Sequence, residues 1–206
     1  EQHLRREFSK IYAAISGESV HIKVTLGKIR SIMVNVMGEV EVPGTYRLSA
    51  FASVFHALYR AGGVNRIGSL RTIQVVRNGE KVADVDVYKY IMEGKLADDI
   101  RLSEGDVILV SPYENLVGIS GKVKRPMIYE MKQGESLATL INYAGGFTGD
   151  AYRNTVRLLR RSGREKQIYN VDKVDYENFI LTDDDEVSVE AVLDRFSNKV
   201  EVRGAV

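Results

Sequence analysis

The chain has 206 residues, of which 44% are hydrophobic and 28% are charged, a composition typical of folded domains rather than of disordered protein. Its 29 basic and 28 acidic residues leave a net charge of +1, which gives no general attraction to nucleic acid or to an anionic membrane. The chain has no cysteine, which excludes disulfides, thiolate catalysis and cysteine-ligated zinc.

The first thirty residues stand outside the pattern that governs the rest of the chain. Apolar residues at helical spacing predict a helix that ends at Gly17, and residues 20–26 have the pattern of a strand. The helical stripe consists of Leu4, Phe8, Ile11, Tyr12 and Ile15. Because the chain starts at Glu1 without a methionine, we expect residues 1–30 to be the tail of a preceding domain in a longer protein. No apolar run approaches the roughly 20 residues needed to span a bilayer.

An internal repeat of 83 residues organises the rest of the chain. Its marker positions, which keep this spacing, are Gly38, Gly121 and Gly204, Pro43 and Pro126, Tyr46 and Tyr129, and the Ala-Gly-Gly triplets that contain Gly62, Gly63, Gly145 and Gly146. Several unrelated residue types kept in one frame indicate a duplicated domain. The repeat predicts domains at 31–112 and 113–196, followed at 197–206 by the start of a truncated third copy.

Each copy is predicted to open with a β-hairpin. Apolar and polar residues alternate along 33–40, the pattern of a half-buried strand, and a partner strand follows at 45–48. Pro43 and Gly44 suit the two central positions of a type II turn, because glycine tolerates the positive φ required there. The second copy has Met127 in place of Gly44, so we expect a turn of another type in that copy.

A short helix is predicted next in each copy. Its apolar residues follow the spacing i, i+3, i+4, i+7, and they are Val54, Ala57, Leu58 and Ala61 in the first copy and Leu137, Leu140, Ile141 and Ala144 in the second. Serines at positions 49 or 53, and at position 136, are candidate caps. The paired glycines of each triplet end the helix, since glycine readily adopts a left-handed conformation.

A second hairpin and one more strand complete the first copy. Residues 73–77 lead into Asn78 and Gly79, a pair typical of a type I′ turn, and the chain returns along 81–87. The last strand is predicted at 107–110.

The second copy ends in the same way. Residues 155–160 run to a turn at Ser162 and Gly163, the chain returns along 167–171, and the last strand is predicted at 186–189. This order predicts an α+β fold in which one helix packs on a small mixed sheet, and it fits the β-grasp, or ubiquitin-like, arrangement.

The order of these motifs resembles the SLBB domain, a soluble-ligand-binding β-grasp module. The resemblance rests on a strand ending V-x-G-x-V, then x-Pro-Gly-x-Tyr, a helix ending in Ala-Gly-Gly, and L-x-x-Gly-Asp-x-Ile-x-Val, and it covers residues 31–190. Tandem copies resemble those of Wza-like bacterial outer-membrane polysaccharide export proteins, and residues 26–40 are similar to members of the Bacteroides type. Met127 and Asp184 depart from the motif in two turns.

The resemblance implies a structural part of a capsule or exopolysaccharide exporter, with no catalysis and no cofactor. It implies a place at the periplasmic face of the outer membrane, with this part of the chain in the aqueous periplasm. Family members form rings around a conduit, so the implied partners are other copies, the polysaccharide in transit and an inner-membrane export protein, and not nucleic acid. The alternative is a soluble-ligand-binding module for a cobalamin-like or oligosaccharide ligand.

One basic cluster is the candidate contact for acidic sugars, because each guanidinium offers a planar fork of donors. It consists of Arg153, Arg157, Arg160, Arg161 and Arg164. The competing interpretation is a solvated hairpin whose long side chains pair in part with neighbouring acidic residues, such as Asp150 and Glu165.

No catalytic residue and no metal ligand are predicted. The acidic run 183–186 offers oxygen ligands of the kind calcium prefers, but it lacks the spacing of an EF-hand loop. His3, His21 and His56 have no metal-ligand spacing, and His56 falls on the polar side of its helix. An enzyme acting on polysaccharide needs two carboxylates placed about a glycosidic bond, whereas the acidic residues here fall mostly in turns.

Overall fold

The computed structural model describes residues 6, 7, 10, 27, 30–94, 99–200 and 204. Of the predicted leading helix, residues 6, 7 and 10 are described and are helical, whereas its apolar stripe and the strand at 20–26 lie outside the described residues. Both sheets of the fold belong to one compact unit, Ile32–Val206.

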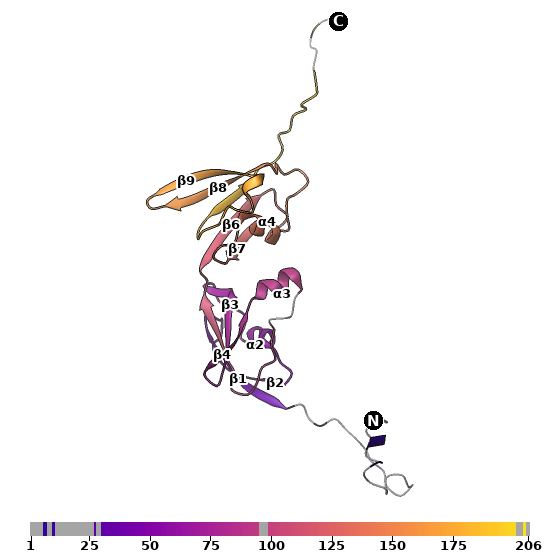
Figure 1. Cartoon of the computed structure of the whole chain (residues 1–206), viewed down its shortest axis with the longest axis vertical. Helices are drawn as coiled ribbons and strands as arrows, with labels where there is room; N and C mark the ends of the chain where they lie inside the picture. The colour runs from indigo at the N-terminus through magenta and orange to yellow at the C-terminus, as the bar shows by residue number, and fades with distance from the viewer. Residues whose placement is uncertain are drawn as a thin grey trace. The chain divides into compact units, whose positions relative to one another are not determined.

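The first sheet has five strands in the order β2-β1-β5-β3-β4, with β1 parallel to β5. Figure 1 shows the course of the chain through both sheets. The strands are β1 (Ser31–Gly38), β2 (Gly44–Ser49), β3 (Gly68–Arg77), β4 (Glu80–Val85) and β5 (Val107–Pro112). Two helices, α2 (Val54–Arg60) and α3 (Val87–Glu93), accompany this sheet.

The second sheet repeats this order as β7-β6-β10-β8-β9, with β6 parallel to β10. Its strands are β6 (Asn115–Gly121), β7 (Met127–Met131), β8 (Thr155–Ser162), β9 (Glu165–Asp172) and β10 (Glu186–Val189). One α-helix, α4 (Leu137–Tyr143), and a 3₁₀ turn, η2 (Lys173–Asp175), accompany it. Two sheets with the same order and the same central parallel pair confirm the α+β class and the tandem β-grasp arrangement.

Each domain has its own apolar core, built from the predicted helix stripe and the alternating strand residues. All eight stripe residues are buried, and Val34 and Val36 of β1 are buried with them. Burying one such aliphatic side chain contributes roughly 1.5–3 kcal/mol. The helical and strand periodicities of the sequence therefore place the same faces in the core as the structure does.

The paired glycines end both main helices as predicted. The N–H of Gly63 donates to the carbonyl of Leu58, and the N–H of Gly146 donates to that of Ile141, each at 2.9 Å. These bonds close the last turn of each helix, and the glycines have positive φ. Ser53 and Ser136 are the N-cap residues, within the predicted set.

The predicted type II turn at Pro43 and Gly44 is wrong. Gly44 begins β2 and does not have a positive φ. The left-handed glycine is instead Gly38, with φ of +83°, and Gly121 has the equivalent +82°. Since Gly44 lies in a strand, its replacement by Met127 at the start of β7 needs no different turn.

The turn between β3 and β4 is confirmed, because Asn78 and Gly79 both have positive φ, as a type I′ turn requires. The returning strand ends at Val85, before the predicted 87, because the chain enters α3, which was not predicted. Asp86 caps α3 by accepting the N–H of Tyr88, and Gly94 ends the helix in a left-handed conformation.

The third copy stays a prediction. Residues 197–200 and 204, the described part of it, form no strand. Gly204 has a φ of +159°, unlike Gly38 and Gly121.

We predict that Gly38→Ala destabilises the first domain by about 2–4 kcal/mol, from overpacking combined with an unfavourable φ. A Cβ on Gly38 would lie 2.1 Å from the carbonyl oxygen of Val110, and one on Gly121 the same distance from that of Val189. Gly44→Ala is the matched control, since a Cβ there meets nothing within 4 Å and φ is ordinary. Urea unfolding measures both, and equal stabilities would contradict the packing argument.

Candidate functional site

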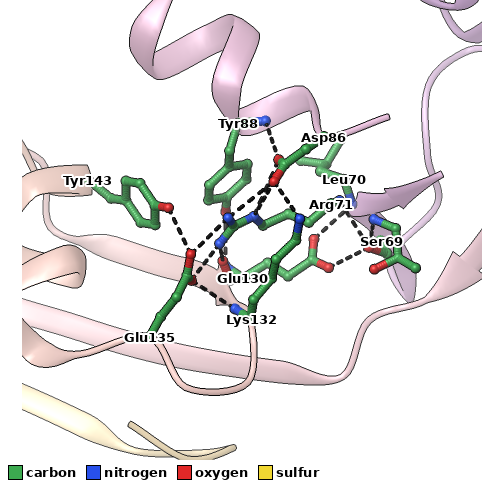
Figure 2. Close-up of polar contacts among 10 residues, drawn as sticks. Ser69, Leu70, Arg71, Asp86, Tyr88, Glu130, Lys132, Glu135 and Tyr143 are labelled. Atoms are coloured by element: carbon green, nitrogen blue, oxygen red, sulfur yellow. Dashed lines mark hydrogen bonds and ion pairs between the residues drawn. The ribbon is translucent and has the colours of Figure 1, made fainter. Parts of the chain in front are cut away.

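A buried polar cluster joins the two β-grasp domains (Figure 2). The first domain supplies residues from the beginning of β3 and from the end of β4 into α3, which are Ser69, Leu70, Arg71, Asp86 and Tyr88. The second domain supplies residues from β7, from the loop that follows it and from α4, which are Glu130, Lys132, Glu135 and Tyr143. Every member therefore sits on, or next to, an element that the β-grasp core holds in place.

Arg71 is at the centre of the cluster and bonds to both domains. Its side chain is only 5% exposed. Nη1 and Nη2 donate to the two carboxylate oxygens of Glu135 at 2.6 and 2.9 Å, and Nη1 also donates to the carbonyl of Glu130 at 3.2 Å. Within its own domain, Nε and Nη2 donate to Asp86 at 3.2–3.3 Å. The guanidinium thus links carboxylates that belong to two different domains.

Asp86 has a second cation from across the interface. The Nζ of Lys132 lies 2.7 Å from its Oδ2, and the carboxylate also accepts the N–H of Tyr88 at 3.0 Å. A single buried side chain therefore caps α3 and ties that helix to the second domain.

Glu130 makes a third link between the domains. Its carboxylate accepts the hydroxyl of Ser69 and the N–H of Leu70, the latter at 2.7 Å. The N–H of Glu130 donates to the hydroxyl oxygen of Tyr88 at 2.9 Å. The edge of β7 is thereby bonded to both β3 and α3 of the first domain.

Two aromatic rings, one from each domain, lie close to the guanidinium. The Cζ of Arg71 is 4.8 Å from the ring centroid of Tyr88 and 5.4 Å from that of Tyr143. The two rings meet edge to face at 5.4 Å, and the Tyr143 hydroxyl donates to Glu135 at 3.1 Å. Tyr88 packs into the apolar core of the second domain, so the contact is hydrophobic as well as ionic.

Burial and pairing set the protonation of the cluster. Burial alone would lower the pKa of Arg71, but its bonds to Glu135 and Asp86 outweigh this effect and raise it. Burial would raise the pKa of Asp86, but Lys132 and Arg71 lower it below the ordinary value of 3.8. For Glu130 burial prevails, and its pKa is raised above 4.5 despite the bonds from Ser69 and Leu70. Arg71 and Asp86 are consequently charged near neutral pH.

The geometry suits a structural role. Every buried side-chain nitrogen or oxygen among the described residues has a hydrogen-bond partner, including those of the cluster. Polar atoms satisfied in this way fix the orientation of the groups that carry them. The cluster can therefore hold one domain against the next.

Each domain also has an internal ion pair at equivalent repeat positions. Arg77 binds Asp106 through two bonds of 2.8 Å, and Arg160 binds Asp185 through bonds of 2.9 and 2.7 Å. Each guanidinium also donates to a backbone carbonyl, that of Arg101 or Ile180. These repeated pairs hold the turn before the last strand against the second hairpin.

The structure does not bring the five predicted arginines to one surface. Arg160 shares the core-facing side of β8 with Val156 and Leu158, whereas Arg157 and Arg161 lie on the opposite side, since strand side chains alternate. Arg157 pairs with Glu190 and Arg161 with Asp184, both at 2.8 Å. Arg153 donates to the carbonyl of Thr148, and Arg164 lies exposed at the hairpin turn. The partners are thus not the Asp150 and Glu165 named in the competing interpretation.

The acidic run 183–186 is engaged within the second domain. Asp183 accepts the N–H of Leu116 at 2.8 Å, as Glu104 accepts that of Met33 in the first domain. Asp184 has a φ of +63°, matching the +81° of Gly105, so the aspartate keeps the turn that the glycine forms.

The grouping of acidic and histidine side chains, and the length of the helices, concern metal binding and membrane spans. Within the described ranges, no three histidine, aspartate or glutamate residues are grouped so that they could hold a metal ion. His56 is exposed, and its Nδ1 accepts the N–H of Ser53 at 3.3 Å. Among the helices that the structure describes, none is long and apolar enough to cross a membrane.

Sequence reasoning missed the interdomain cluster. Its charged members are far apart along the chain, and two of them do not recur in the repeat: Arg71 aligns with Asn154, and Glu135 with Ala52. A hint lay in this mismatch, because a charged residue without a repeat counterpart has no role in the common fold.

Comparison with known proteins identifies both domains. Residues 33–110 and 116–170 each match a family model described as SLBB domain, and together the matches cover more than half of the chain. Two sequences of polysialic acid transport protein KpsD from Escherichia coli are each 26% identical to this chain over 151 residues. The aligned part is 72% of this chain and 26% of the relative, so the chain spans about a quarter of the length of these relatives.

We predict that Arg71→Ala lowers the free energy of unfolding by about 3–5 kcal/mol, because it leaves the buried carboxylate of Asp86 and the partly buried carboxylate of Glu135 without their shared cation. Arg157→Ala is the matched control, since it breaks an exposed ion pair worth no more than about 1 kcal/mol. Denaturant unfolding monitored by circular dichroism gives both values. A loss for Arg71→Ala as small as that of the control would show that the cluster does not stabilise the protein.

Proposed function

Because the chain belongs to the SLBB domain family and carries two copies in tandem, we propose that it is a non-catalytic structural part of a bacterial polysaccharide export protein. We place it in the periplasm, at the inner face of the outer membrane. The single observation that carries this proposal is the hydrogen-bonded contact around the buried Arg71, which joins the two SLBB domains. The KpsD relatives, which are named as transport proteins, support it.

The proposed mechanism uses shape rather than bond chemistry. A rigid pair of β-grasp domains forms a section of wall, and the polymer passes by steric guidance and weak polar contacts. The ionised groups of the interdomain cluster are used in holding the domains together, which supports a role without a reactive group. In this proposal the partners are further copies of the parent protein in a ring, the polysaccharide in transit and an inner-membrane export protein.

A second candidate function is binding of a soluble ligand, and exposed arginines favour an acidic oligosaccharide. Arg153, Arg157, Arg161 and Arg164 are exposed around the β8–β9 hairpin, and the related KpsD is named for polysialic acid, an acidic polymer. The guanidinium of Arg160 is already held by Asp185, so it contributes to such a site only through its neighbours. A cobalamin-like ligand is the other form of this alternative.

We predict that deleting residues 31–189 from the parent protein in its host abolishes surface polysaccharide and leaves polymer inside the cell envelope. The measurement is surface and periplasmic polysaccharide by immunoblot, with Lys81→Gln, an exposed position outside the arginine cluster, as a control that retains export. Wild-type amounts of surface polymer in the deletion strain would contradict the proposal, as would shortening of the polymer by the purified chain.

Titration of the purified chain with sialic acid oligomers and with cobalamin distinguishes the ligand-binding function from the structural one. The structural proposal predicts binding no tighter than millimolar. Micromolar binding of the oligomers, weakened by a combined Arg157→Gln and Arg161→Gln change but not by Lys81→Gln, would favour the ligand-binding function instead.

A further inference from the structure

An open groove of about 490 Å³ lies on the first domain, beside β2, α2 and α3. Aromatic side chains form much of its lining. The rings of Phe55 and Tyr90 lie with their centroids 4.5 Å apart, Phe51 is exposed, and Tyr59 is 86% exposed. Adjacent exposed aromatic groups mark a contact surface on a protein.

The repeat shows what covers the equivalent surface of the second domain. In the 83-residue frame, Ala52 and Arg60 of the groove correspond to Glu135 and Tyr143. These two residues receive the first domain: Glu135 binds its central guanidinium, and Tyr143 packs edge to face on Tyr88. The groove is therefore the counterpart, on the first domain, of a surface that a β-grasp neighbour covers on the second.

The surface of the first domain that contacts the second domain, formed by Arg71, Asp86 and Tyr88, is called here the docking surface. It also has a counterpart on the second domain. The registers of the two hairpins align the start of α3 with η2. In this alignment Asp86 corresponds to Asp172 and Tyr88 to Val174. Tyr88 is buried against the second domain, whereas Val174 is 82% exposed.

The two open surfaces carry opposite charges. Arg60 lines the groove, and the guanidinium of Arg101 lies 5.8 Å from the ring centroid of Phe51 at its edge. Around Val174 the acidic residues Asp172, Asp175 and Glu177 are exposed together with one cation, Lys173, so this surface has a net negative charge. The ionic contact at Arg71 has the cation on the docking surface, and here the cations are on the groove instead. Opposite charges favour encounter of the two surfaces and fix their register.

We propose that the groove of one copy of this chain receives the η2 surface of a second copy, head to tail. Val174 packs among Phe51, Phe55 and Tyr59, and the aspartates beside it face Arg60 and Arg101. This contact is heterologous, since each copy keeps one free groove and one free η2 surface, so chains of copies form rather than closed dimers. The inference goes beyond the proposed export role and does not depend on it.

Sedimentation velocity of the full 206-residue chain tests the proposal over roughly 10 μM to 1 mM, the range of weak association. The weight-average mass is expected to rise steadily with concentration without levelling at the dimer. Tyr59→Asp and Val174→Asp each weaken association at least tenfold, and both side chains are exposed enough for the domains to fold unchanged, which circular dichroism checks. Ile168→Asp, an exposed apolar position on β9, is the matched control and leaves association intact.

Mixing the two variants gives the sharper result. Tyr59→Asp keeps its η2 surface and Val174→Asp keeps its groove, so a mixture forms dimers that stop at one copy of each. A wild-type chain that stays monomeric at 1 mM would overturn the proposal. So would association that Ile168→Asp weakens equally, or a mixture that does not associate. Binding of sialic acid oligomers to the groove of a monomeric chain would assign it to a sugar instead.

Discussion

The guanidinium of Arg71 lies between two β-grasp domains where almost no solvent reaches it, and it must be neutralised there. An unpaired buried ion costs several kcal/mol even after the protein relaxes. The neutralising carboxylates come from both sides, Asp86 in the first domain and Glu135 in the second. The first domain alone supplies only Asp86, and the Glu135 carboxylate and the Glu130 carbonyl complete the set of partners only when the two domains meet in this way. The proposed role as a section of wall depends on this constraint.

The ion pairs of this chain have two different structural roles, one within each domain and one between the domains. The pairs Arg77–Asp106 and Arg160–Asp185 recur in the repeat, and each holds a turn inside its own domain. The cluster around Arg71 occurs once, and it holds the domains to each other. The head-to-tail proposal follows from the same distinction. The two surfaces that meet around Arg71 have counterparts in the repeat, namely the groove that contains Tyr59 and the η2 surface that contains Val174, and both of these residues are exposed.

The fold could be predicted because the same pattern of strands, helix and glycines occurs twice in the sequence. Short apolar stripes are ambiguous alone, but Leu58 and Ile141 fall in the same frame before the same pair of glycines. Local chemistry was a weaker guide. The Pro-Gly pair favoured a turn at Gly44, yet tertiary packing puts the left-handed residue at Gly38, where a Cβ would strike the neighbouring strand. Helix α3 was missed because its seven residues, rich in aromatic and β-branched side chains, continue the pattern of a strand.

The interdomain site could not be predicted, because its chemistry arises only from packing. Ser69 and Glu130 carry no motif, and they meet only when β3 and β7 have folded. The arginine cluster illustrates the converse. Five basic residues close in sequence suggested one surface, but strand alternation turned Arg160 toward the core and Arg157 away from it.

Rigid coupling of the two domains through Arg71 is most directly tested by an electron spin resonance distance measurement. The chain has no cysteine, so Glu80→Cys and Lys166→Cys place one spin label on each domain at exposed positions. The wild-type background should give a single narrow distance distribution, and the Arg71→Ala background a broad one. A distribution that is equally broad in both backgrounds would show that the cluster does not fix the domains, and the account would fail.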